Sequence, residues 1–130
     1  MLNIEVAAGI LVNQNKHILL AQRSNLKKFP LQWEFPGGKL EDNELVQAAL
    51  IRELKEELGI KIHNPKFLMK LEHSYEEFRV KIHFYLINSW SGLAVGNEGQ
   101  VIQWYSKEEL KDVDLLAADT PVIKELRKIL

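Results

Sequence analysis

The chain has 130 residues, no cysteine and a net charge of −1 at pH 7. This length suits one domain over residues 1–130 with a core of its own, and the lack of cysteine excludes disulfides and thiolate metal sites. The near-neutral charge argues against a protein that binds nucleic acid directly through a basic surface, but it does not exclude a nucleotide ligand.

No targeting or membrane segment is predicted. Residues 1–12 lack the basic start of a targeting peptide and are interrupted by Glu5. No apolar run approaches the roughly 20 residues of a membrane span. We therefore expect a cytoplasmic protein that does not contact a membrane, and we expect a monomer.

Short strands are predicted for the first third of the chain. Ile4–Val12 and His17–Arg23 are apolar runs on either side of a polar turn, and we expect them to pair as a hairpin. A polar, basic loop follows at residues 24–31. Residues 33–35 precede Pro36, which favours an extended backbone before the proline.

A glycine turn and one helix are predicted next. Gly37 and Gly38 allow a tight turn and a close approach of the backbone to a ligand. Asp42 or Asn43 is the candidate N-cap of the helix. Gly59 is a natural helix stop.

One face of this helix is apolar and the neighbouring face is acidic. At about 100° per residue, the core-facing stripe consists of Leu50, Ile51, Leu54 and Leu58. The acidic arc consists of Glu53, Glu56 and Glu57. Carboxylates near a helix C-terminus oppose the helix dipole, and a bound Mg²⁺ or Mn²⁺ would offset their repulsion. The alternative is a solvated acidic face that is partly neutralised by Arg52, Lys55 and Lys61.

Three more strands are predicted in the second half of the chain, at residues 66–74, 78–90 and 100–105. The second of them alternates apolar and polar residues, as a strand with one buried face does. Ser106 and Glu109 have the spacing of a capping box and predict a short helical turn.

A final helix is predicted for residues 122–130. Thr120 and Pro121 precede it as a cap and a first-turn proline. The order of strands and helices predicts a mixed α/β fold, in which a mixed β-sheet is flanked by helices on both faces.

With the helix identified, the chain resembles the Nudix hydrolase family, whose motif is GX5EX7REUXEEXGU with U an aliphatic residue. Nine constrained positions over 23 residues match without departure: Gly38, Glu44, Arg52, Glu53, Leu54, Glu56, Glu57, Gly59 and Ile60. The segments HILLAQR, WEFPGGKLE, GNEGQ and ADTPV look like the MutT branch of that family. The resemblance implies a Nudix α/β/α sandwich that hydrolyses a nucleoside triphosphate, notably 8-oxo-dGTP, to the monophosphate and pyrophosphate.

The resemblance also implies a metal-dependent catalytic centre. Mg²⁺, for which Mn²⁺ can substitute, would be bound by Glu53, Glu56, Glu57, the side chain of Glu98 and the backbone carbonyl of Gly37. We favour Glu53 as the general base that activates water, with Glu98 as the rival. Without the resemblance, Glu98 is interpreted as an ordinary exposed loop glutamate.

Arg52 is expected to support catalysis by orienting carboxylates. It lies one turn from Glu56 and can pair with it. Glu44 is nearly opposite Glu53 on the helix, so we do not expect it to bind the same metal. A first-turn complement to the helix dipole is as good an interpretation of Glu44 as any functional one.

The substrate-binding residues are predicted mainly from the resemblance. Arg23 would contact the nucleotide, and Glu34 would help to position the sugar or base. Phe35 and Phe78 are candidates for the pocket wall, although isolated aromatic residues more often belong to the core. Lys39 would contact phosphate, or is a solvated loop lysine.

Asp119 departs from the MutT branch, whose best-known members have Asn at this point of the ADTPV segment. An amide offers a donor and an acceptor, as N7–H and O6 of 8-oxoguanine require, whereas an ionised Asp only accepts. An ionised Asp119 would suit an exocyclic amine, such as that of cytosine or adenine. The alternative is that Asp119 helps to cap the last helix.

Three functions follow from these patterns. We favour a Mg²⁺-dependent hydrolase that removes 8-oxo-dGTP from the nucleotide pool and so avoids mutation during DNA replication. The alternative is the same chemistry on CTP, 5-methyl-dCTP or another modified triphosphate. A non-catalytic nucleotide sensor is the third hypothesis, and the retention of all three helix glutamates argues against it.

Overall fold

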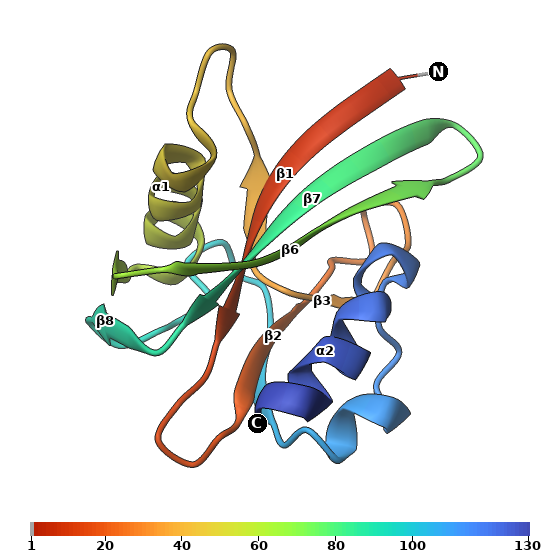
Figure 1. Ribbon diagram of the computed structural model, residues 1–130. Coiled ribbons are helices and arrows are strands. Elements are labelled where there is room, and N and C mark those ends of the chain that lie inside the picture. The colour runs from red at the N-terminus through yellow and green to blue at the C-terminus, as the bar shows by residue number, and fades with distance from the viewer. Residues whose placement is uncertain (1) are drawn as a thin grey trace.

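The computed structural model describes residues 2–130, and a four-stranded sheet lies at its centre (Figure 1). In sheet order, the strands are β4 (Gly37–Lys39), β1 (Leu2–Leu11), β7 (Phe78–Ile87) and β6 (Lys66–Ser74). β1 and β7 are parallel, whereas β4 and β6 run antiparallel to their neighbours. The prediction of a mixed sheet is confirmed.

Two smaller sheets accompany the central one. The first consists of β3 (Trp33–Glu34), β2 (Ile18–Gln22) and β9 (Ile102–Tyr105). The second pairs β5 (Lys61–His63) with β8 (Ser89–Ser91). The prediction of one continuous strand over residues 78–90 is therefore wrong. The chain leaves the central sheet after Ile87, because the segment that follows pairs with β5.

The predicted hairpin between the first two strands is also wrong. An antiparallel bridge joins Val12 to Ile18 beside the turn, and β1 and β2 then diverge into different sheets. β7 pairs along the whole of one edge of β1, and β4 pairs with Val6–Ala8 on the other edge. Beyond the bridge, β2 pairs with β3 and β9 instead.

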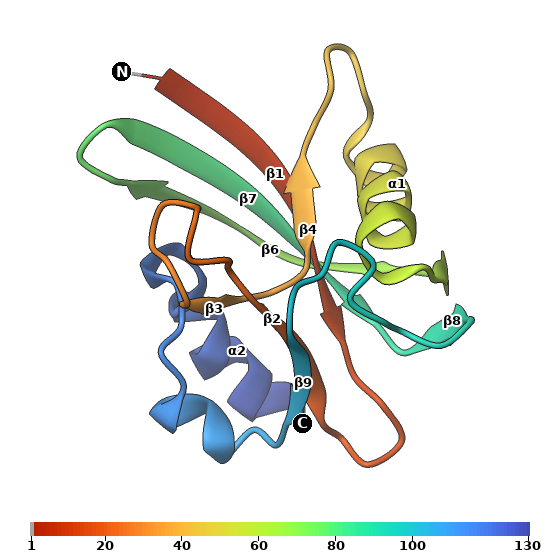
Figure 2. The same ribbon diagram turned by 180° about the vertical axis from the view of Figure 1, so that it is seen from behind.

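Two helices lie on opposite sides of the central sheet (Figures 1 and 2). They are α1 (Val46–Leu58) and α2 (Pro121–Ile129), and α2 confirms the predicted final helix. Leu50 and Leu54 of α1 pack in one buried cluster, and Val122 and Leu126 of α2 pack in the other. The chain is thus an α/β sandwich, as the sequence predicts.

The boundaries of α1 differ from the prediction at its start and agree at its end. Neither Asp42 nor Asn43 caps the helix, because the chain still turns there, with a φ of 62° at Asn43, and the helix begins only at Val46. Gly59 adopts a φ of 72° and donates its N–H to the Lys55 carbonyl, as a helix stop does. Ile51 is 43% exposed and does not belong to the buried stripe, in which Ala49 takes its place.

Two short 3₁₀ helices, η1 (Glu109–Asp112) and η2 (Ala117–Asp119), precede α2. The predicted capping box is confirmed, since the Ser106 N–H donates to the Glu109 carboxylate and the Glu109 N–H donates to Ser106 Oγ. Within residues 2–130, no helix is long and apolar enough to cross a membrane.

Candidate active site

A cavity of about 780 Å³ lies along β1, β4 and β7 and extends to the acidic face of α1. Ten of the twelve site residues predicted from the sequence line it: Arg23, Glu34, Phe35, Gly37, Lys39, Glu53, Glu57, Phe78, Glu98 and Asp119. Arg52 and Glu56 are not among the lining residues. The fold therefore brings together residues that are almost one hundred positions apart in sequence.

Glu57 is the most deeply placed carboxylate of α1 in this cavity. Its Oε2 accepts the Gly37 N–H at 3.1 Å, which ties the helix to the edge strand β4. Burial raises the pKa of Glu57 to about 8, against the opposing effect of the Gly37 N–H. Further negative charge adds to the increase, from Glu34, Glu98 and Glu53.

Glu53 lies one turn earlier and packs against the glycine turn. A Cβ atom on Gly38 would lie 2.2 Å from the Glu53 carboxylate, so only glycine permits this approach. Glu53 Oε1 accepts a hydrogen bond from Arg52 Nη1 at 2.8 Å. The close packing holds the carboxylate at the cavity wall.

Arg52 connects Glu53 to Glu44. Its Nε and Nη2 donate to the two oxygens of Glu44, each at 2.9 Å, and Nη2 also donates to the Lys39 carbonyl. This pairing lowers the pKa of Glu44 to about 2. Glu44 precedes α1, so its predicted role as a first-turn dipole complement is wrong, and it serves as the anchor of Arg52. The predicted contact of Arg52 with Glu56 is present but longer, at 3.5 Å.

Glu98 reaches the cavity because its loop caps the C-terminus of α1. The N–H groups of Val95 and Asn97 donate to the carbonyls of Leu58 and Glu57. The side chain of Gln100 donates to the Glu57 carbonyl and accepts the Glu98 N–H. The sequence reasoning missed Gln100, although the GNEGQ segment contains it. Glu98 is exposed but lines the cavity.

The residues near α1 suit a hard divalent cation by their chemistry. Glu53, Glu57 and Glu98 supply carboxylate oxygens to one cavity, and carboxylate oxygens are the ligands that hard divalent cations prefer. In the arrangement of residues 2–130, no three acidic, histidine or cysteine side chains converge closely enough to hold an ion. Glu53 and Glu57 instead contact Arg52 and Gly37, so binding requires these carboxylates to turn.

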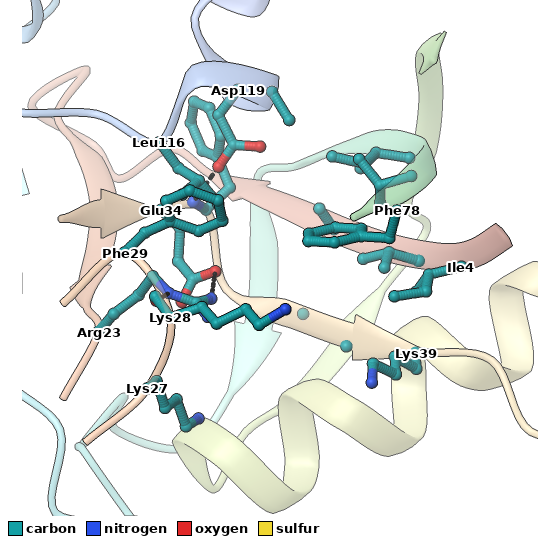
Figure 3. A pocket seen from close by; sticks show the side chains of 18 of the residues that line it. Ile4, Arg23, Lys27, Lys28, Phe29, Glu34, Lys39, Phe78, Leu116 and Asp119 are labelled. Atoms are coloured by element: carbon teal, nitrogen blue, oxygen red, sulfur yellow. Dashed lines mark hydrogen bonds and ion pairs between the residues drawn. The ribbon is translucent and has the colours of Figure 1, made fainter. Parts of the chain in front are cut away.

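Basic and acidic side chains lie together in the part of the cavity around Arg23 (Figure 3). Arg23 donates to both oxygens of Glu34, at 3.0 and 3.2 Å, and to the Lys28 carbonyl. Burial raises the pKa of Glu34, and Arg23 opposes that increase. Lys27 and Lys28 line the cavity with Lys39, and sequence reasoning missed both of them. The basic loop that follows Arg23 is the signal that could have found them.

Aromatic rings form the apolar wall. Phe35 is 4% exposed and packs edge-on against Phe84, so it belongs to both the core and the cavity. Phe78 also lines the cavity, near Ile4 (Figure 3). Phe29 and Tyr75 line it as well and were missed, since nothing in the sequence relates residue 29 to residue 75.

Asp119 is buried at the far end of the cavity, 4% exposed. Its Oδ2 accepts the Phe35 N–H at 3.1 Å, while its other carboxyl oxygen points into the cavity (Figure 3). The alternative that Asp119 caps α2 is wrong, because the carboxylate bonds to β3–β4 backbone and α2 has no side-chain cap. Burial raises the pKa of Asp119 to about 8, which the Phe35 N–H opposes.

Comparison with known proteins identifies the family of the chain. The family model for the NUDIX domain matches residues 3–126. The chain is a member of the NUDIX domain family. Together with the relatives described next, this makes it a Nudix hydrolase, as the helix motif indicates.

Two curated relatives match over most of their length. The 8-oxo-dGTP diphosphatase of Escherichia coli K12 is 34% identical over 129 residues, covering 99% of this chain and 100% of that protein. The CTP pyrophosphohydrolase of the same organism is 35% identical over 121 residues, covering 93% and 89%. A solved structure from work on MutT of Aliivibrio salmonicida and Vibrio cholerae has a TM-score of 0.85 at 29% identity, covering 98% and 99% of the two chains. This Nudix hydrolase therefore has MutT-like relatives in both sequence and fold.

Arg52→Lys is expected to lower kcat by about 10- to 100-fold, because residues that orient the carboxylates of a metal site have effects of this size. Lysine keeps the charge but cannot form the paired bonds to Glu44 and the bond to Glu53 together. Steady-state pyrophosphate release measures the change. Arg127→Lys, on the exposed face of α2, is the matched control. Unchanged kcat in Arg52→Lys would mean that Arg52 does not orient Glu53.

Proposed function

We propose that this Nudix hydrolase is a Mg²⁺-dependent pyrophosphohydrolase, with Mn²⁺ as a substitute, that converts 8-oxo-dGTP to 8-oxo-dGMP and pyrophosphate. It acts as a single domain and a monomer on the free nucleotide pool of the cytoplasm, and so limits mutation. The single observation that carries the choice of base is the buried carboxyl of Asp119. The similarity to the 8-oxo-dGTP diphosphatase of E. coli supports the same choice.

The carboxyl of Asp119 matches guanine-type bases when it is neutral. With a pKa of about 8, it is protonated in the folded protein at neutral pH. A neutral carboxyl has one donor and one acceptor, like the amide of Asn. It can donate to O6 and accept from N7–H of 8-oxoguanine. The expectation that Asp119 only accepts hydrogen bonds assumed the ordinary pKa of an aspartate. Burial raises this pKa, so the assumption no longer holds.

The phosphate end of the cavity supplies the hydrolytic groups. Bound Mg²⁺ would neutralise phosphate oxygens and acidify a water molecule. In this proposal Glu53, Glu56, Glu57, Glu98 and the Gly37 carbonyl hold the ion. Glu53 is the general base that removes a proton from the attacking water.

Five other side chains stabilise and place the substrate. Lys39 neutralises charge at the phosphates, and Arg23 holds Glu34 at the sugar and base. Phe35 and Phe78 enclose the base between the sheet and η2. Water attack at the β-phosphorus releases pyrophosphate and leaves the monophosphate in the base pocket.

A panel of triphosphates tests the proposal. Pyrophosphate release is measured with 8-oxo-dGTP, dGTP, CTP and 5-methyl-dCTP at equal concentrations with Mg²⁺. We expect 8-oxo-dGTP to have the highest kcat/KM. Equal rates on 8-oxo-dGTP and dGTP would refute the sanitising role while leaving hydrolysis intact.

The second candidate substrate is CTP or a related pyrimidine triphosphate. The observation that favours it is the similarity to the CTP pyrophosphohydrolase of E. coli, at 35% identity. In that case CTP or 5-methyl-dCTP would be the preferred substrate of the panel. The ionised form of Asp119 would then accept from the exocyclic amine, so the rate would increase above pH 8.

A further inference from the structure

Tyr75, in the turn between β6 and β7, contacts three segments of the chain that line the cavity. Its ring lies 4.6 Å from that of Phe29, in the loop after β2, and 4.9 Å from that of Phe78, at the start of β7. Its hydroxyl oxygen accepts the Ala118 N–H at 2.9 Å, in η2. These segments are far apart in sequence, and Tyr75 connects them.

The hydrogen bond to Ala118 is important because of its place in η2. The first N–H groups of a short helix have no partner within the helix and need one from outside. Ala118 is 2% exposed, so water does not supply that partner freely. Tyr75 provides it, and the next residue along the chain is Asp119.

Asp119 is thereby held from two directions. The Phe35 N–H binds one carboxyl oxygen, and the Tyr75 hydroxyl fixes the backbone that carries the side chain. Losing the hydroxyl would free η2 to shift, while the Phe35 contact alone would not set the direction of the second oxygen. The carboxyl would then point less accurately into the cavity.

We propose that Tyr75 is a positioning residue for base recognition, which acts by holding η2 so that Asp119 faces the base. This inference rests on the proposed function, in which Asp119 contacts the base. The hydrogen bond and ring contacts of Tyr75 described above do not involve the carboxylates of α1. Its loss should therefore weaken binding of the substrate rather than slow hydrolysis of bound substrate.

Tyr75→Phe keeps the ring and removes the hydroxyl. We expect KM for 8-oxo-dGTP to rise about tenfold, the size expected when a buried N–H loses its partner, with kcat within about twofold of the parent. Tyr105→Phe is the matched control, since Tyr105 does not line the cavity, and it should leave both constants unchanged. Equal constants for Tyr75→Phe and the parent would overturn the proposal.

A double-mutant cycle with Asp119→Ala tests whether the effect passes through Asp119. If it does, Tyr75→Phe should change KM less than about twofold in the Asp119→Ala background. Independent, multiplying effects would overturn the proposal. The cycle uses the triphosphate that the parent hydrolyses with the highest kcat/KM. The substrate panel therefore tests which base is bound, and the cycle tests only the coupling between Tyr75 and Asp119.

Amide hydrogen exchange gives a readout that needs no turnover. In the parent, the Ala118 amide should be protected, and in Tyr75→Phe its exchange should be at least about tenfold faster, in line with the loss of one hydrogen bond. Amides of β1 serve as the internal reference. An unprotected Ala118 amide in the parent would overturn the proposal, even if Tyr75→Phe failed to fold.

Discussion

Glu53→Gln is expected to lower kcat about a thousandfold, with a smaller change in KM, because a general base contributes between about 10² and 10⁴. The substitution keeps the size of the side chain and its hydrogen bond with Arg52 in reach, but the amide cannot take a proton from water. Steady-state pyrophosphate release at saturating substrate measures the loss.

Two companion variants make this result interpretable. Glu125→Gln removes the same charge on the outer face of α2, where Glu125 pairs with Lys128, and should leave kcat unchanged. Glu98→Gln tests the rival base at the other side of the cavity. If Glu53→Gln keeps full turnover while Glu98→Gln loses it, Glu98 is the base. An unchanged melting temperature shows that the variants are folded.

Asp119→Ala is expected to lower kcat/KM for 8-oxo-dGTP about 100-fold, because a recognition group buried in the site loses both of its hydrogen bonds to the base. Asp119→Asn should retain the preference at neutral pH, since a neutral carboxyl and an amide offer the same donor and acceptor. The kcat/KM values of both variants for 8-oxo-dGTP and dGTP measure this. A full loss of preference in Asp119→Asn would show that the ionised carboxylate reads the base.

The raised pKa of Asp119 also predicts a pH dependence. Above about pH 8 the carboxyl ionises and loses its donor, so KM of the parent for 8-oxo-dGTP should rise, and Asp119→Asn should not show this rise. Ionisation of Asp119 also lowers the stability of the folded chain. The pKa is higher in the folded than in the unfolded chain, where it is near 3.8. The contribution to stability is therefore complete below pH 3.8 and is lost as the pH rises to about 8. Urea unfolding of parent and Asp119→Asn across this range measures the difference.

The sequence alone determined the reaction class and most of the elements. The helix motif predicts the reaction class through its resemblance to the Nudix family. Predictions of helix ends and caps were confirmed where they depend only on neighbouring residues. The stop at Gly59 and the capping box at Ser106 are examples. These features depend on residues within one or two turns.

Only the tertiary structure decided strand pairing and the partners of Arg52. Of the predicted hairpin only the bridge between Val12 and Ile18 forms, because β1 pairs with β4 and β7 while β2 pairs with β3 and β9. Glu44 pairs with Arg52 because the turn before α1 folds back, which helical spacing does not describe. The strand pairing depends on competition between distant segments, and the Glu44–Arg52 pair depends on the conformation of the turn before α1.

For Asp119, too, the sequence and the folded structure each determine a different property. Its position in the ADTPV segment predicted it as a candidate for base recognition but could not assign its protonation state. Burial at the end of the cavity raises its pKa to about 8, and burial is a property of the folded chain. The sequence by itself thus determined a Nudix hydrolase with three glutamates on one helix. The tertiary structure decided which groups share the cavity and buried Asp119 there, which raises its pKa, because solvent exclusion arises only when distant segments pack together.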